Sequence, residues 1–124
     1  MPSRYELAAD ETVPAAKSII AKVLAEKYDI KETDIADYLG VAQAAISKYL
    51  TEKYSDNLKR RIREIEGEIR GQRDLIDGYI KKIAEGNEEY VNVCICTICG
   101  IANDTICAFS HACTKRNASA SGGV

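Results

Sequence analysis

The chain has 124 residues and a formal net charge of −2 at pH 7; 46% of its residues are hydrophobic, with one Phe and no Trp. A chain this short has little room for an elaborate enzyme cleft, and a core filled by aliphatic side chains favours an all-α fold over a sheet sandwich. No stretch approaches the roughly 18 apolar residues of a membrane span and Met1–Asp10 has no apolar run, so we expect a soluble, cytoplasmic protein with no membrane partner.

The first predicted element is a helix over Val13–Tyr28. Its apolar residues recur at steps of three and four, namely Ala16, Ile19, Ile20, Val23, Leu24 and Tyr28. Pro14 can occupy an early helical position, where its missing N–H costs nothing. We expect this helix to be the scaffold for the elements that follow.

Two short helices are predicted next, at about Glu32–Leu39 and Gln43–Thr51. Gly40 separates them and supplies the tight turn that other residues resist, and small Ala36 lets the two helices approach. The apolar residues that would fill the wedge between these helices and the scaffold are Ile35, Leu39, Val41, Ile46 and Tyr49 or Leu50. This spacing of small, glycine and apolar residues predicts that residues 1–54 are a helix-turn-helix DNA-binding domain.

The second helix of that motif carries the predicted DNA contacts. Its exposed residues, with one that follows the helix, are Gln43, Ala44, Ser47, Lys48, Thr51 and Lys53. Gln43 suits an adenine edge and Ala44 a thymine methyl, whereas Ser47, Lys48 and Lys53 suit phosphates. Six basic residues against two acidic ones between positions 48 and 63 give a local balance of +4 beside them. The alternative is a helical hairpin that binds another protein.

A heptad pattern follows and predicts a dimerisation helix within residues 55–86. Apolar or seam residues alternate at steps of four and three over Leu58, Ile62, Ile65, Ile69, Gln72, Ile76, Tyr79 and Ile83, here called the heptad stripe. Isoleucines at the a positions favour two parallel strands, and the register would pair Arg61 with Glu66, and Glu68 with Arg73, of a second copy. A parallel coiled-coil homodimer would present two DNA-binding heads to a palindromic operator.

Residues 87–113 contain all five cysteines and are predicted to bind a metal or a cluster. The candidate ligands are Cys94, Cys96, Cys99, Cys107 and Cys113, with His111 as a possible alternative ligand. Cys96 and Cys99 have the C-x-x-C spacing that lets two thiolates reach one metal from a tight turn, and Cys94 is the expected spare. An iron–sulfur cluster is favoured, with a structural zinc or a metal-free thiol switch as alternatives. Residues 114–124 are predicted to be a disordered tail.

These features together resemble a known family. Residues 13 to 54 resemble phage-repressor-like helix-turn-helix proteins, and the whole chain resembles small archaeal transcription regulators that join such a domain to a cysteine-bearing tail. The chain departs from that pattern at Ala42, where family members commonly carry a capping Ser or Thr. The resemblance implies metal binding through a C-x-x-C, a further Cys and a nearby His, which Cys96, Cys99, Cys107 and His111 match.

The sequence therefore predicts a dimeric, sequence-specific transcription regulator that binds double-stranded DNA and senses redox, iron or sulfur status through an iron–sulfur cluster. A regulator with structural zinc, and a redox or metal-delivery protein that does not bind DNA, are the alternatives. We do not expect an enzyme, because the chain has no nucleophile–base pair, phosphate loop or paired catalytic carboxylates at meaningful spacing.

Overall fold

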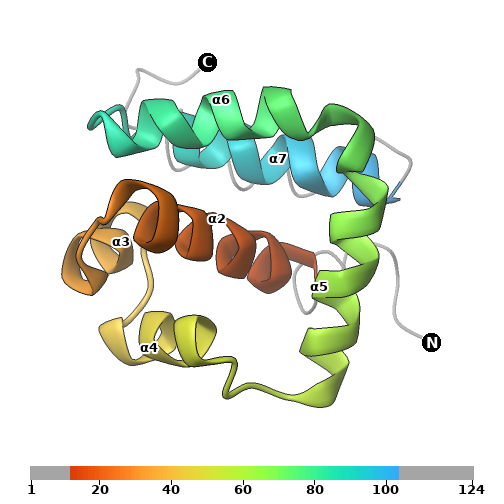
Figure 1. Ribbon diagram of the computed structural model, residues 1–124, viewed down its shortest axis with the longest axis horizontal. Helices are drawn as coiled ribbons and strands as arrows, with labels where there is room; N and C mark the ends of the chain where they lie inside the picture. Colours follow the sequence, from red (N-terminus) through yellow and green to blue (C-terminus); the bar gives the residue numbers. More distant parts are fainter. Residues whose placement is uncertain (1–11, 104–124) are drawn as a thin grey trace.

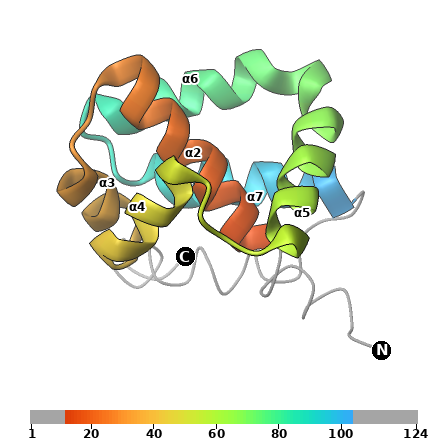
Figure 2. The ribbon, with the colours of Figure 1, turned by 60° about the horizontal axis from the view of Figure 1, so that its bottom comes forward.

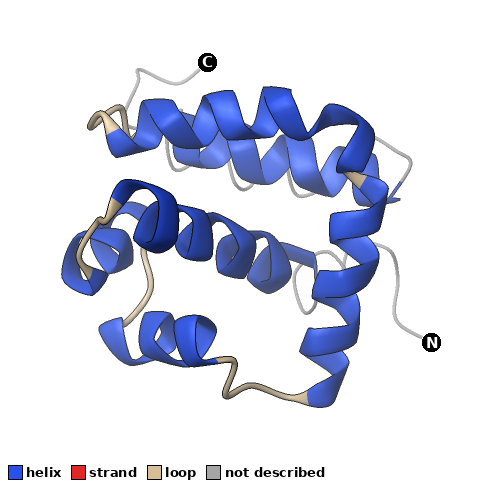
Figure 3. Ribbon diagram, viewed as in Figure 1, coloured by secondary structure: helices blue, strands red, loops and turns tan. Residues whose placement is uncertain are grey.

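The computed structural model describes residues 12–103. Within this range, helices joined by short turns account for the chain and no strand is present (Figure 3). The prediction of an all-α fold is confirmed for these residues. Cys107, His111, Cys113 and the predicted tail over 114–124 lie outside the described residues. Among helices of the described range, none combines the length and the apolar character that a membrane span requires.

The first three helices have the predicted bounds. They are α2 (Val13–Tyr28), α3 (Glu32–Leu39) and α4 (Gln43–Thr51), and α2 carries its proline in the first turn. Gly40 has a φ of 65°, in the left-handed region that favours glycine, and ends α3. The turn there brings α3 and α4 against α2, so the three helices form one packed unit (Figure 1).

The prediction of one continuous helix through the heptad stripe is wrong. The structure has α5 (Asp56–Glu68), a 3-10 turn η2 (Arg70–Gln72) and α6 (Arg73–Ala84), and the chain bends sharply between the two α-helices (Figure 1). Gln72, with φ −124° and ψ 22°, leaves the helical conformation. Gly67 and Gly71 each weaken a helix by about 1 kcal/mol relative to alanine, and packing against other helices outweighs the local periodicity.

The last described helix, α7 (Tyr90–Asn103), runs back beside α6 (Figures 1 and 2). A short turn over residues 85–89 joins them, and Gly86 in that turn has a φ of 102°. The ring centroids of Tyr79 in α6 and Tyr90 in α7 lie 5.9 Å apart. We call this pair the α6–α7 hairpin.

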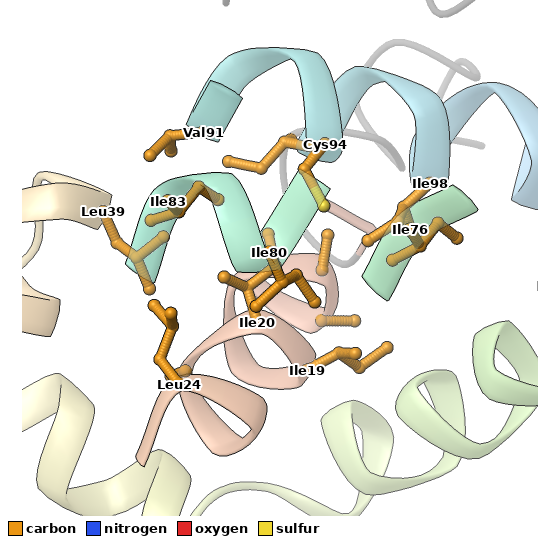
Figure 4. Close-up of a cluster of buried hydrophobic side chains, with 14 of the residues drawn as sticks. Ile19, Ile20, Leu24, Leu39, Ile76, Ile80, Ile83, Val91, Cys94 and Ile98 are labelled. Atoms are coloured by element: carbon orange, nitrogen blue, oxygen red, sulfur yellow. The ribbon is translucent and has the colours of Figure 1, made fainter. Parts of the chain in front are cut away.

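All the described α-helices contribute to one core, and α2 lies at its centre. Ile20 of α2 lies beside Ile80 of α6 there, and Leu24 of α2 lies beside Leu39 of α3, with further side chains from α6 and α7 around them (Figure 4). Helices α5, α6 and α7 share this core with the first three helices, so the packing does not separate a head ending at residue 54 from the rest of the chain.

The isoleucines of the heptad stripe are covered by other helices of the same chain, whereas the sequence predicted that a second copy covers them. Each is at most 6% exposed; the residues are Ile62, Ile65, Ile69, Ile76 and Ile83. The charges expected to pair between chains pair locally instead, because Arg61 contacts Glu64 at 3.1 Å and Arg73 contacts Asp77 at 3.1 Å. An apolar stripe on a helix needs to be buried, and the same sequence pattern results whether its own chain or a second chain buries it.

Candidate nucleic-acid interface

Helix α4 is held against the rest of the molecule by one face. Ile46, at the middle of that face, is 0% exposed, and Ala45, Tyr49 and Leu50 are half-buried beside it. The helix packs on both α2 and α3. Its N-cap, Ala42, provides no side-chain hydrogen bond, as expected from a side chain that has no oxygen. The position of α4 therefore depends on apolar packing and on the Gly40 turn.

The opposite face of α4 is open to solvent. All six residues predicted to contact DNA are exposed, namely Gln43, Ala44, Ser47, Lys48, Thr51 and Lys53. Gln43, Ser47 and Thr51 follow one another at steps of four, so they lie along one line of the helix, with Ala44 and Lys48 on the adjacent line. The structure thus brings these five side chains together on one surface, which we call the α4 face, and Lys53 follows two residues after the helix.

Within the α4 face, Thr51 already has a hydrogen bond. Its Oγ1 donates to the backbone oxygen of Ser47 at 2.8 Å. This bond uses the proton of the Thr51 hydroxyl, so the side chain can offer a ligand only the acceptor lone pairs of Oγ1 and its methyl group. Gln43 and Lys48, at the start and middle of the helix, carry the longer polar side chains of this surface.

The basic residues after α4 divide into two groups. Lys59, Arg60 and Arg63 on α5 are exposed. Arg61 is half-buried and is used structurally, since it contacts Glu64 and Glu68 and donates a hydrogen bond to Oγ1 of Thr12 at 3.2 Å. Ser55 starts α5 by accepting a hydrogen bond from the Leu58 N–H at 3.2 Å. The local balance of +4 therefore overstates the positive charge available to phosphates.

The end of α4 is tied to α2 by a contact that sequence reasoning missed. Nζ of Lys22 lies 3.3 Å from Oε2 of Glu52. Burial alone lowers the pKa of Lys22, but the hydrogen bond to Glu52 and the nearby Tyr54 outweigh it, so the pKa is raised above its usual value. Burial raises the pKa of Tyr49, whose ring lies 6.4 Å from that of Tyr54. No local sequence signal links positions 22 and 52.

The cysteines within the described range lie on α7, so the predicted tight turn at Cys96–Cys99 is wrong. Helix α7 continues through both residues and through Gly100. Its buried face carries Cys94 and Cys99, together with Val91, Ile95 and Ile98, whereas Cys96 is half-buried on a different side. The spacing of 91, 94, 95, 98 and 99 is that of a helix packed along one face.

Cys94 has the surroundings of a core residue. Burial raises the pKa of its thiol to about 12, the charge of Asp77 acts in the same direction, and Arg73 opposes them. The thiol therefore keeps its proton at neutral pH, whereas metal binding needs the thiolate.

No group of three or more His, Cys, Asp or Glu side chains among residues 12–103 is arranged to hold a metal ion. Cys94, Cys96 and Cys99 in α7 thus do not form a ligand set as they stand. The other predicted ligands, Cys107, Cys113 and His111, lie outside the described residues. Comparison of the chain with protein-family models, with curated proteins and with solved structures gave no match.

Proposed function

We propose that the chain is a sequence-specific DNA-binding transcription regulator that inserts the N-terminal part of α4 into the major groove. One observation carries the proposal. Five of the six residues that the sequence singled out lie together on the exposed α4 face, and the sixth, Lys53, is exposed just after the helix, while Ile46 on the opposite side is fully buried and holds the helix on its scaffold. A helix fixed by one face and polar on the other is the element that major-groove recognition uses.

The roles on this surface follow from side-chain chemistry. Gln43, in the first turn, has an amide that matches the donor and acceptor edge of adenine, and the methyl of Ala44 suits the methyl of thymine. Ser47, Lys48 and Lys53 supply donors for phosphate oxygens, and Lys59 and Arg60, which are exposed on α5, are further positive charges. Phosphate contacts fix the position of the helix, and base contacts select the sequence.

The sensing function stays a prediction. The proposed sensor is an iron–sulfur cluster, with zinc as the alternative, and it depends on Cys107 and Cys113 outside the described residues. Use of Cys94 and Cys99 as ligands would require α7 to leave its packing against α2 and α6, because both thiols are buried there. Iron, sulfide and zinc contents of protein purified without oxygen test this function separately. If all three are absent, the sensing function is rejected and the DNA-binding proposal is unaffected.

The decisive test of DNA binding is selection from random-sequence duplexes with the full chain. We expect one sequence to be enriched and bound far more tightly than a scrambled duplex. Lys48→Ala should weaken binding several-fold, whereas the matched control Lys81→Ala, an exposed lysine on α6, should not. No enrichment, or equal losses in both variants, contradicts the proposal and favours a protein that docks through α4 to another macromolecule.

A further inference from the structure

The bend between α5 and α6 interrupts a sequence pattern that runs on without a break. Every position of the heptad stripe except Gln72 is buried or half-buried in the folded chain. Gln72 alone is exposed, and it lies in the 3-10 turn where the helix stops. If α5, η2 and α6 formed one straight helix, Gln72 would rejoin the same stripe between Ile69 and Ile76.

Few side-chain contacts hold the bend in place. Residues 70–72 include no buried side chain, and a Cβ added at Gly67 or Gly71 would meet nothing within 4 Å. The backbone departs from helical geometry at Ile69, with φ −88° and ψ −1°, and most strongly at Gln72, while Arg73 already has φ −60° and ψ −36°. A change at very few backbone dihedrals therefore suffices to straighten this segment.

The part of the chain beyond the bend is a packed unit of its own. In the α6–α7 hairpin, Ile76, Ile80 and Ile83 of α6 lie against Val91, Cys94 and Ile98 of α7 (Figure 4). The hairpin covers α2 from one side, and α7 also touches α5. It can therefore leave and return as one body without losing its internal contacts.

We infer that this chain forms an exchanged dimer with a second copy of itself, in which α5, η2 and α6 are one continuous helix and each hairpin packs on α2 of the partner. Every buried contact between the hairpin and α2 or α5 is kept, but it now joins two chains. Only the bend changes conformation, which is the condition under which exchange of an element between copies is cheap. The short connection between α5 and α6 favours it, because straightening restores helical hydrogen bonds there.

In the exchanged form, the central turns of the two straight helices come together at the dimer axis. Ile69, Gln72 and Ile76 lie on one side of the straight helix, at steps of three and four. Gln72 is thus in solvent in the single chain and at a contact in the dimer. The chemistry of that one position should control the dimer and leave the single chain unaffected.

The test is the molar mass of the full chain in solution, measured by light scattering under reducing conditions from micromolar to millimolar concentration. We expect the mass to rise from one copy to two. Gln72→Leu should lower the dimer dissociation constant about tenfold or more, and Gln72→Lys should raise it by a similar factor. Arg70→Leu is the matched control, because it places the same exposed side chain in the same turn but off the stripe.

Equal association of Gln72→Leu and Arg70→Leu would show only a nonspecific effect of added apolar surface and would overturn the inference. So would monomers at all concentrations for both variants and the original chain. Hydrogen exchange of residues 67–75 separates the exchanged dimer from a dimer of bent chains. Their amides should exchange more slowly in the dimer if the helix is continuous, and equally fast exchange in both forms contradicts the proposal.

Discussion

Nζ of Lys22, on α2, lies 3.3 Å from Oε2 of Glu52, the residue that ends α4. Glu52 has a φ of 59°, a left-handed conformation that a side chain other than glycine adopts at a cost. The same residue therefore stops the helix and ties it to the scaffold. Because Gln43 lies at the other end of α4, this contact helps set the direction in which the α4 face points.

The two roles of Glu52 are separable by substitution. Glu52→Gly removes the ion pair, worth about 0–1 kcal/mol at an exposed site, and relieves the left-handed strain. Glu52→Ala removes the ion pair and keeps the strain. We expect the glycine variant to be more stable than the alanine variant by about 1 kcal/mol in urea unfolding. Equal stabilities would mean that the backbone at this position is not constrained.

Local signals predicted the first three helices with their ends. The apolar spacing of α2, the proline in its first turn and Gly40 after α3 each act over a few residues, so the sequence contains the whole cause. The exposed side of α4 followed from the same periodicity. The contact between Lys22 and Glu52 could not be predicted, because it depends on how α4 crosses α2.

The helix through the heptad stripe was predicted wrongly for a different reason. A repeat of isoleucines indicates which side of a helix is buried, but it does not indicate whether the same chain or another chain buries it. The hairpin and α2 provide that cover within one chain, and the bend at residues 70–72 makes this possible. The prediction of a tight turn at Cys96–Cys99 was wrong for a similar reason. The apolar residues between the cysteines form the buried face of a helix, and Cys94 and Cys99 lie on that face of α7.

Two neighbouring substitutions on α6 distinguish the folded arrangement from a parallel coiled coil. Ile80 is 0% exposed, whereas Leu75 is 45% exposed. Ile80→Ala should cost about 2–5 kcal/mol of unfolding free energy because it leaves a cavity, and Leu75→Ala should change it by less than about 0.5 kcal/mol. Denaturant unfolding measures both. Similar costs at the two sites would instead match the coiled coil, in which both positions flank the heptad stripe.

The two kinds of DNA contact assigned to α4 predict different losses. Gln43→Ala should reduce the preference for the selected sequence over its single-base variants, by about 1–3 kcal/mol at one base pair. Lys48→Ala should weaken binding to every sequence. It should also reduce the slope of log K against log salt concentration by about one, because one phosphate contact is lost. Binding titrations at several salt concentrations distinguish the two. Identical effects from both changes would contradict the assigned roles.

The described cysteines should differ in reactivity. Cys96 is half-buried, whereas Cys94 is buried and its pKa is raised to about 12. At neutral pH a soluble alkylating reagent should modify Cys96 first, and Cys94 only as fast as α7 opens. Peptide mapping by mass spectrometry follows each site, with urea-unfolded protein as the control in which the difference disappears. Equal rates in the folded protein would place Cys94 outside the core.

Stability should decline in alkaline solution. Burial raises the pKa of Cys94, and the pKa values of Tyr49 and Lys22 are raised as well. The folded state therefore holds protons that the unfolded chain has released, so the stabilisation is complete below about pH 9 and falls as the pH rises toward 12. Urea unfolding across this range should show the decline. Cys94→Ala, although less stable at neutral pH, should show a shallower slope, and an unchanged slope would exclude Cys94 as a contributor.

Helix α2 packs against every other α-helix of the described residues, with α3 and α4 on one side and the α6–α7 hairpin on the other (Figure 1). Helix α2 therefore connects the packing of α4 with the packing of the cysteine-bearing α7. A chain cut after residue 54 would lose the cover that α6 and α7 give to Ile20, so we expect α2, and with it the support of α4, to be less stable. The position of α4 consequently depends on the packing of the described chain as a whole.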